Sequence, residues 1–214
     1  MTLVQVYDII ITLKWTFVKE LVKTYTNRGV MSMYKGNNRS ALLSQKLIAD
    51  AMLRLLEKTP FSDISISDLC KEAQVSRQTF YSLFSTKENV IVYELQHNCC
   101  YTPAGNDTES RAKAFREFCA EYSRYITSKK MIIELLVKND MMHCLYDVQY
   151  QNLIGCTSFI EEVSGDYRTF LIDFIASGMN SIARNYIQTG CSFDENTLSC
   201  LMVSLFSGTF FIEK

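Results

Sequence analysis

Apolar residues recur every three to four positions from about residue 40 to the end of the chain. This spacing places them on one face of a helix, and no segment alternates apolar and polar residues as a half-buried strand would. Only two prolines and eight glycines interrupt the 214 residues, which favours long helices. The pattern predicts an all-α fold, with helices over residues 40–58, 66–73, 77–83, 86–100, 109–128, 130–138, 140–163, 167–189 and 194–212.

Residues 1–38 form an N-terminal extension ahead of this pattern, and a helix over about 3–25 is expected within it. Three interpretations of the extension are open: an upstream addition with the usual start at Met31 or Met33, an accessory helix, or a membrane-surface anchor. A signal peptide is not expected, because Asp8 precedes the apolar run and no small-residue cleavage site follows. No apolar run reaches the ~18 residues that span a bilayer, so the expected partners include no membrane.

Two short helices joined by a tight turn follow Ser65. Ser65 and Asp68 form a capping signature for the first helix, and Ser76 is a good N-cap for the second, residues 77–83. The second helix would bury Phe80 and Phe84 and turn its polar residues outward. A helix presented in this way is the element that enters the DNA major groove in a helix-turn-helix. The outward residues are Arg77, Gln78, Thr79 and Tyr81.

Further DNA contacts are expected on either side of this pair. Ser85 and Glu88 form a second capping box, which places Lys87 in the first turn of the next helix. The helix dipole disfavours a cation there by about 0.3–1 kcal/mol, and a bound phosphate would reverse that sign. The polar arm 35–39 either reaches into a minor groove or is a solvated linker. Ser65, Lys46 and Arg39 complete the predicted contact set.

About fifteen spaced positions between Gln45 and Glu94 resemble the DNA-binding domain of the TetR family of bacterial regulators. They include Ile48, Ala51, Leu55 and Phe61, the run ISDL at 66–69 and the run AQVSRQTFYSLFSTKENV at 73–90. The resemblance implies that Thr79, Tyr81 and Lys87 contact phosphates while Arg77 and Gln78 face base edges. One position departs from the family, since the turn usually carries glycine and this chain has Gln74. A residue other than glycine with positive φ costs about 1–2 kcal/mol there.

The chain is therefore divided into the extension 1–38, a helix-turn-helix DNA-binding domain at 39–88, and a helical effector-binding and dimerisation domain at 89–214. A cluster of proline, glycine, asparagine and aspartate at 101–107 is the clearest break in the pattern. The run 167–190 is similar to a TetR branch that includes regulators of dihydroxyacetone kinase, through Ser177, Gly178 and Tyr186. That branch raises an alternative function, a TetR-like coactivator that works through a protein partner.

In the TetR family the middle helices enclose a pocket for a small-molecule effector. Aromatic residues at helical spacing also suit an ordinary core, so both interpretations are open. The candidates are the residues that combine an apolar body with a polar tip. They are Tyr122, Tyr125, His143, Tyr146 and Tyr150.

The last two helices carry more apolar surface than one face can bury, which predicts a homodimer. Two copies of the pair would form a four-helix bundle about a two-fold axis. Gly178 would let a second backbone approach, or it would fit a bulky neighbour within one subunit. The predicted interface residues are Phe174, Ser177, Gly178, Leu201 and Leu205.

Composition narrows the function. The chain has 22 basic and 23 acidic residues, which is weak evidence against a protein that coats nucleic acid indiscriminately. Two histidines, eight cysteines without metal-ligand spacing and no catalytic motif predict neither an enzyme nor a metal or cofactor. The cysteines are expected to be reduced thiols in the cytoplasm, with Cys70, Cys119, Cys144 and Cys200 in apolar faces. The predicted protein is a cytoplasmic homodimeric repressor that binds a palindromic operator and is released by a small molecule.

Overall fold

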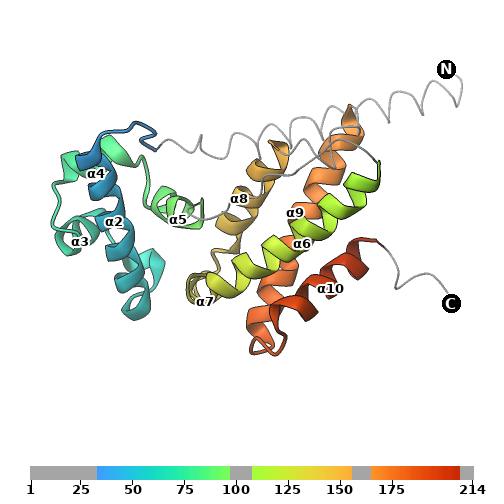
Figure 1. Cartoon of the computed structure of the whole chain (residues 1–214). Helices are drawn as coiled ribbons and strands as arrows, with labels where there is room; N and C mark the ends of the chain where they lie inside the picture. Colours follow the sequence, from blue (N-terminus) through green and yellow to red (C-terminus); the bar gives the residue numbers. More distant parts are fainter. Residues whose placement is uncertain (1–32, 97–107, 156–164, 208–214) are drawn as a thin grey trace, which may run out of the picture.

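The computed structural model describes residues 33–96, 108–155 and 165–207, and helices account for most of them (Figure 1). The predicted helix at 3–25 and the break at 101–107 lie outside these ranges. The all-α prediction is confirmed. The elements are α2 (Arg39–Lys58), a 3₁₀ turn η1 (Phe61–Asp63), α3 (Ile66–Glu72), α4 (Arg77–Leu83), α5 (Lys87–Gln96), α6 (Thr108–Ser128), α7 (Lys130–Lys138), α8 (Met142–Ile154), α9 (Asp166–Gln188) and α10 (Glu195–Phe206).

Most boundaries fall within two residues of the predicted ones. The two largest differences are the ends of α8 and α10, predicted at 163 and 212, which lie at Ile154 and Phe206, before the C-caps Gly155 and Ser207. The smaller differences have local causes. Helix α8 begins at Met142 rather than at 140, because Asp140 has a φ of 55° and ends the preceding helix instead. Helix α5 begins at Lys87 rather than at Thr86, and the Thr86 hydroxyl accepts a hydrogen bond from the Asn89 N–H at 3.3 Å. The turn η1 was not predicted, since three residues are too few to show a helical period.

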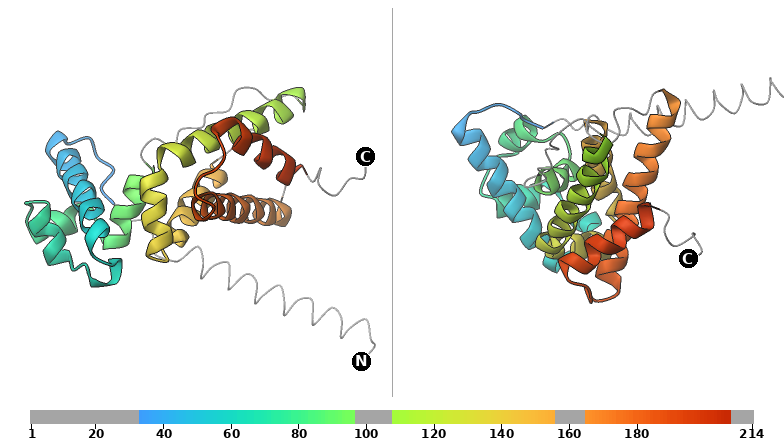
Figure 2. Two further views of the ribbon diagram at one scale, coloured as in Figure 1. Left: turned by 90° about the horizontal axis from the view of Figure 1, so that it is seen from below. Right: turned by 45° about the vertical axis from the view of Figure 1, so that its right-hand side comes forward.

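Helices α2, α3 and α4, together with η1, form a headpiece at one end of the molecule (Figures 1 and 2). Ile48 and Met52 of α2, Leu69 of α3 and Phe80 of α4 are each fully buried in its core. The chain that leads into α2 is pinned to the same unit. Met33 pairs with Phe84 in an antiparallel bridge, and the Tyr34 N–H donates to the Leu83 carbonyl at 2.9 Å.

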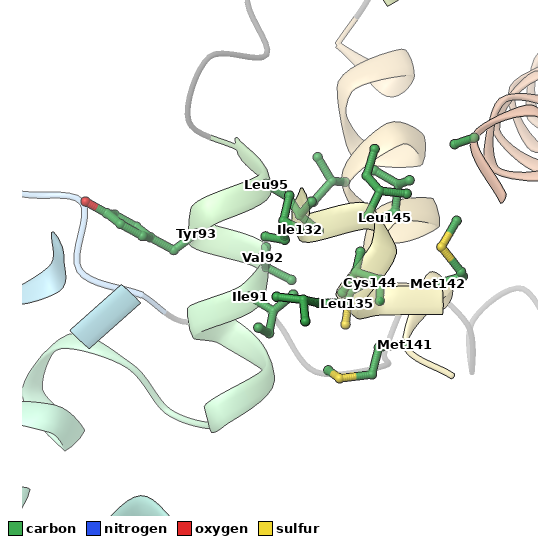
Figure 3. Packing of buried hydrophobic residues seen from close by; sticks show 14 of the residues in the cluster. Ile91, Val92, Tyr93, Leu95, Ile132, Leu135, Met141, Met142, Cys144 and Leu145 are labelled. Carbon is green, nitrogen blue, oxygen red and sulfur yellow. The ribbon is translucent and has the colours of Figure 1, made fainter. Parts of the chain in front are cut away.

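Helix α5 joins the headpiece to the rest of the molecule. Its residues Val92 and Leu95 lie toward α7 and α8, whereas Tyr93 points the opposite way (Figure 3). The Tyr93 ring meets the Phe84 ring edge-on with a centroid distance of 5.6 Å. One hydrophobic core therefore runs from the headpiece through α5 into the remaining helices. We retain the division after residue 88 as a proposal, with α5 shared by both parts.

Helices α6 to α10 form a bundle at the other end, in which α6 packs on α10 and α8 packs on α9. Within the described residues no helix is long and apolar enough to cross a membrane. Cys119 and Cys144 are buried as predicted, and burial raises the pKa of each thiol to about 12. Cys70 is also buried, but Cys200 is exposed, because it lies on the solvent side of α10.

Candidate nucleic-acid interface

Helix α4 has one buried and one exposed face, as its sequence predicted. Phe80 and Leu83 are buried, at 0% and 4% exposure, and hold the helix on the headpiece core. The Ser76 hydroxyl caps the helix by accepting the Thr79 N–H at 2.9 Å. Side chains on the opposite face reach solvent, and Thr79 is half-buried. The exposed ones are Arg77, Gln78, Tyr81 and Ser82.

The turn before α4 has the left-handed backbone conformation expected at Gln74, where the TetR family usually has glycine. Gln74 has a φ of 56°, in the left-handed region that favours glycine. Its N–H bonds to the Lys71 carbonyl at 3.2 Å, and the Val75 N–H bonds to the Cys70 carbonyl at 3.0 Å. These two bonds close the end of α3 and fix the direction in which α4 leaves it.

Lys87 is held within the headpiece. Its Nζ donates to the carbonyl oxygens of Phe61 at 2.6 Å and Ile64 at 2.9 Å, with Ser62 at 3.5 Å. The same Nζ lies 4.3 Å from the centroid of the Phe61 ring. All three protons of the ammonium group thus face the η1 turn. The phosphate role of Lys87 stays a prediction, and in this arrangement its ammonium group fastens α5 to η1.

The remaining predicted contacts lie on the surface of the headpiece. Ser65 and Asp68 form the expected capping box: the Ser65 hydroxyl accepts the Asp68 N–H at 3.1 Å, and the carboxylate accepts the Ser65 N–H at 3.2 Å. Lys46 and Arg39 are exposed on α2, whose first turn is capped by Asn38. The Ser65 hydroxyl is thus committed to the cap of α3, while Lys46 and Arg39 face solvent.

Comparison with known proteins agrees with this geometry. A family model described as bacterial regulatory proteins, tetR family, matches residues 48–93. The HTH-type dhaKLM operon transcriptional activator DhaS of Lactococcus lactis is 24% identical over 172 residues, which span 77% of this chain and 90% of that protein. The HTH-type transcriptional regulator EthR of Mycolicibacterium smegmatis is 42% identical over 71 residues, 33% of this chain and 30% of that protein. Residues 48–93 are thus a DNA-binding segment of the TetR type.

Two solved structures share the fold of this chain beyond the headpiece. Lin0861 from Listeria innocua superposes with a TM-score of 0.67 at 19% identity, over 85% of this chain and 98% of that one. The dihydroxyacetone kinase operon activator DhaS gives 0.50 at 20% identity, over 81% and 99%. The protein is therefore a DNA-binding transcriptional regulator with a headpiece of the TetR type and a bundle similar to that of DhaS.

The predicted effector residues of this chain do not converge on one point. Tyr122 and Tyr125 are buried and stacked at 5.9 Å, but their hydroxyls donate to different partners, the Met179 carbonyl at 3.2 Å and the Leu95 carbonyl at 2.9 Å. Tyr146 stacks on Tyr150 at 5.8 Å, nearer the surface. The Tyr146 hydroxyl donates to Asp173; burial first and this carboxylate second raise its pKa. His143 is exposed.

Two buried amides that sequence reasoning missed lie beside Tyr122. Gln149 is 3% exposed and its Nε2 donates to the Tyr122 hydroxyl, while Asn180 is 8% exposed and follows Met179 in α9. In the described part of the chain, neither the Gln149 Oε1 nor the Asn180 Oδ1 has a hydrogen-bond partner. A polar residue on the inward face of an otherwise apolar helical pattern was the signal that could have found them.

A surface hollow in the headpiece is unrelated to these groups. It has a volume of about 590 Å³ and lies between α2, η1 and α3, where Arg54 bonds to Glu72 at 2.7 Å. Charged side chains of both signs line it, so it lacks the apolar lining of a typical small-molecule site.

The predicted dimer residues divide into two groups. Phe174 is 63% exposed and Leu205 is 43% exposed, and Ser177 also faces solvent. Gly178 instead faces its own subunit, where a Cβ would lie 2.8 Å from the Phe206 ring. The geometry at Gly178 therefore favours the interpretation in which the glycine fits a bulky neighbour within one chain. Leu201 is half-buried on α10.

Proposed function

We propose that this regulator is a cytoplasmic repressor that binds a palindromic operator as a homodimer and is released by a small molecule. The observation that carries the proposal is the exposed polar face of α4 on a helix whose opposite face is fully buried. Buried aromatic anchors hold such a helix rigidly, so its polar side chains can meet base edges at fixed positions. Arg77 and Gln78 read bases, and Thr79 and Tyr81 bind phosphates.

The dimer is supported by the exposed aromatic face of α9. Tyr167, Phe170 and Phe174 recur at helical spacing and are 79%, 55% and 63% exposed. Leu205 of α10 extends this surface, and the Phe174 and Phe206 rings lie edge-on at 6.2 Å. A contiguous apolar patch of this kind is typical of an interface. A second copy would cover it and hold two headpieces at the spacing of two half-sites.

The effector site is supported by the polar groups inside the bundle. Among the described residues, the buried acceptor oxygens of Gln149 and Asn180 have no partner, which is unfavourable unless another group supplies donors. The buried polar side chains of the described part of the bundle are all uncharged, namely Ser123, Gln149 and Asn180. This interior suits an uncharged effector that carries hydrogen-bond donors and contacts Tyr122 and Gln149.

The test begins with genomic footprinting of the full-length protein, which identifies the operator. Uncharged hydroxylated metabolites are then screened for release of that operator duplex. Gln149→Leu should bind the operator normally but lose the response to the releasing compound. Gln151→Leu, an exposed change in the same helix, should keep both properties. Absence of any bound operator would reject the function, and a fully responsive Gln149→Leu would reject this effector site.

Activation is the second candidate function, because DhaS is described as a transcriptional activator. A TetR-like coactivator working through a protein partner would use the same headpiece. Transcription in vitro from the footprinted promoter separates the two: a repressor lowers transcript levels when added alone, whereas an activator or coactivator raises them.

A further inference from the structure

The η1 turn of the headpiece is capped by a residue of the bundle. Its first residue, Phe61, follows Pro60, which provides no side-chain cap to the turn. The Phe61 N–H instead donates to the Oδ1 of Asn139 at 2.9 Å, across 78 residues of sequence. Asn139 is the C-cap residue of α7. The first N–H groups of a helical turn have no partner within the turn, so this bond supplies a missing one.

The orientation of the Asn139 amide is fixed by its second bond. Its Nδ2 donates to the Leu135 carbonyl of α7 at 2.8 Å. Turning the amide over would place Nδ2 against the Phe61 N–H and Oδ1 against a carbonyl, so both contacts would become repulsive. The Asn139 side chain therefore presents an acceptor to the headpiece and cannot exchange it for a donor.

The other end of η1 is also fastened. Lys87, the first residue of α5, donates to the carbonyl oxygens of Phe61 and Ile64. At the far end of α5, Lys129 pairs with Glu94 at 2.7 Å, and its Nζ also donates to the Glu94 carbonyl at 3.1 Å. Helix α5 is thus fixed to η1 at its first residue, and to the bundle by the Lys129–Glu94 pair and by the packing shown in Figure 3.

If α5 were the sole connection, rotation of the headpiece about the axis of α5 would be less restrained. The bond from Asn139 to Phe61 joins the headpiece to the bundle through residues outside α5, and α7, which Asn139 caps, also contacts α2. The turn η1 leads directly into α3 and α4, so the bond acts on the part of the headpiece that faces DNA.

We propose that Asn139 is a positioning residue for DNA binding: by capping η1 across the two parts of the molecule, it sets the angle between α4 and the dimerising bundle. This inference rests on the proposed function, because the angle matters only when two headpieces of a dimer read two half-sites. Their separation on B-DNA is about one helical turn or a multiple of it, so a fixed angle selects one operator spacing.

The test uses full-length protein and the footprinted operator, together with duplexes in which one or two central base pairs are added or removed. Wild type should bind the native spacing best. Asn139→Ala should bind the native spacing about 3- to 10-fold more weakly, the range for losing one hydrogen bond. It should also lose less affinity than wild type when the spacing changes. Its salt dependence should stay unchanged, because no phosphate contact is removed.

Two further variants separate positioning from a general structural role. Asn139→Asp keeps an acceptor for the Phe61 N–H but loses the donor to the Leu135 carbonyl, so it should restore most, not all, of the spacing preference. Asn185→Ala, an exposed asparagine on α9, should match wild type throughout. If Asn139→Ala fails to fold, Asn139→Asp is compared with Asn139→Ser, whose shorter side chain should not reach Phe61.

Two results would overturn the inference alone: a spacing profile of Asn139→Ala parallel to that of wild type, or a changed salt slope. A wild-type protein that binds all spacings equally would instead reject two-half-site binding, and the role of Asn139 with it. The two failures are therefore distinguishable.

Discussion

Gln74 occupies a backbone position whose conformation favours glycine. Its φ of 56° follows from the tight turn between α3 and α4, and a side chain in that region costs about 1–2 kcal/mol. Gln74→Gly should therefore raise the free energy of unfolding by about 1 kcal/mol, after allowing for the greater freedom of glycine in the unfolded chain. Urea denaturation measures the change. Gln74→Ala keeps the strain and should show no gain, and equal stability of all three proteins would contradict the argument.

Lys87 has two possible roles that predict different measurements. As a phosphate contact, its loss would lower the salt slope of DNA binding by about 1. Because its Nζ bonds to the carbonyls of Phe61 and Ile64, we expect Lys87→Met to reduce stability by about 1.5–3 kcal/mol and leave the slope unchanged. Lys46→Met, an exposed change on α2, should leave stability within about 0.5 kcal/mol. A lower slope with full stability in Lys87→Met would support the phosphate role.

At the residue scale, the sequence predicts which side of a helix a residue faces but not its distant partners. The outward face of α4 could be predicted, because a period of 3.6 residues assigns Phe80 and Arg77 to opposite sides without any knowledge of the fold. The partners of Lys87 and Asn139 could not, because they lie 26 and 78 residues away in the chain. No local pattern records a contact of that kind.

At the scale of elements, α3 depends on a capping box that responds to pH. The hydrogen bonds from the Ser65 side chain and then its N–H lower the pKa of Asp68. A folded-state pKa below the unfolded value means that this carboxylate stabilises the protein above about pH 3.9, and that the contribution is lost as pH falls through the lower folded value. Asp68→Ala should thus be less stable than wild type at pH 7, and the difference should shrink below pH 4.

The measurement is urea unfolding of both proteins from pH 7 to pH 2.5. Ser65→Ala removes the hydroxyl bonds to Asp68 but keeps the backbone N–H that donates to its carboxylate, so it should lose only part of the pH dependence. A difference between wild type and Asp68→Ala that stays constant over this range would contradict the role of the capping box.

Predicted and observed helix ends agree where a side chain caps the helix. They differ where the backbone conformation alone sets the end. Ser65, Ser76 and Asp194 each accept the N–H three residues on, as their position before an apolar run predicts. The start of α8 was misplaced, because the left-handed residue Asp140 carries no strong sequence signal. The turn η1 was not predicted, because it is too short to show a helical period.

At the scale of the whole molecule, the exposed aromatic face of α9 predicts the oligomer. Changing both Phe170 and Phe174 to Ser should yield a folded monomer, since both side chains are more than half exposed. Operator affinity should fall, because each headpiece would then bind a half-site alone. Sedimentation and gel shift measure the two effects. The matched control, Leu42→Ser with Leu43→Ser, changes exposed apolar residues of the headpiece and should remain dimeric.

Gly178→Ala tests a residue of α9 that faces a neighbour within its own chain rather than the exposed aromatic face. Its Cβ would lie 2.8 Å from the Phe206 ring, so the variant should lose stability while its sedimentation stays that of wild type. A folded Gly178→Ala monomer, or a stable dimer of the Phe170 and Phe174 variant, would show that the interface lies elsewhere.

The bridge between Met33 and Phe84 has a practical consequence for handling the protein. It fixes the chain beside the C-terminal end of α4, so a tag joined directly to Met33 in a shortened protein would start next to that helix. The last described residues after α10 lie at the opposite end of the molecule (Figures 1 and 2). An affinity tag or fluorophore is therefore better placed after α10, where it reports on the regulator without competing with the operator for space.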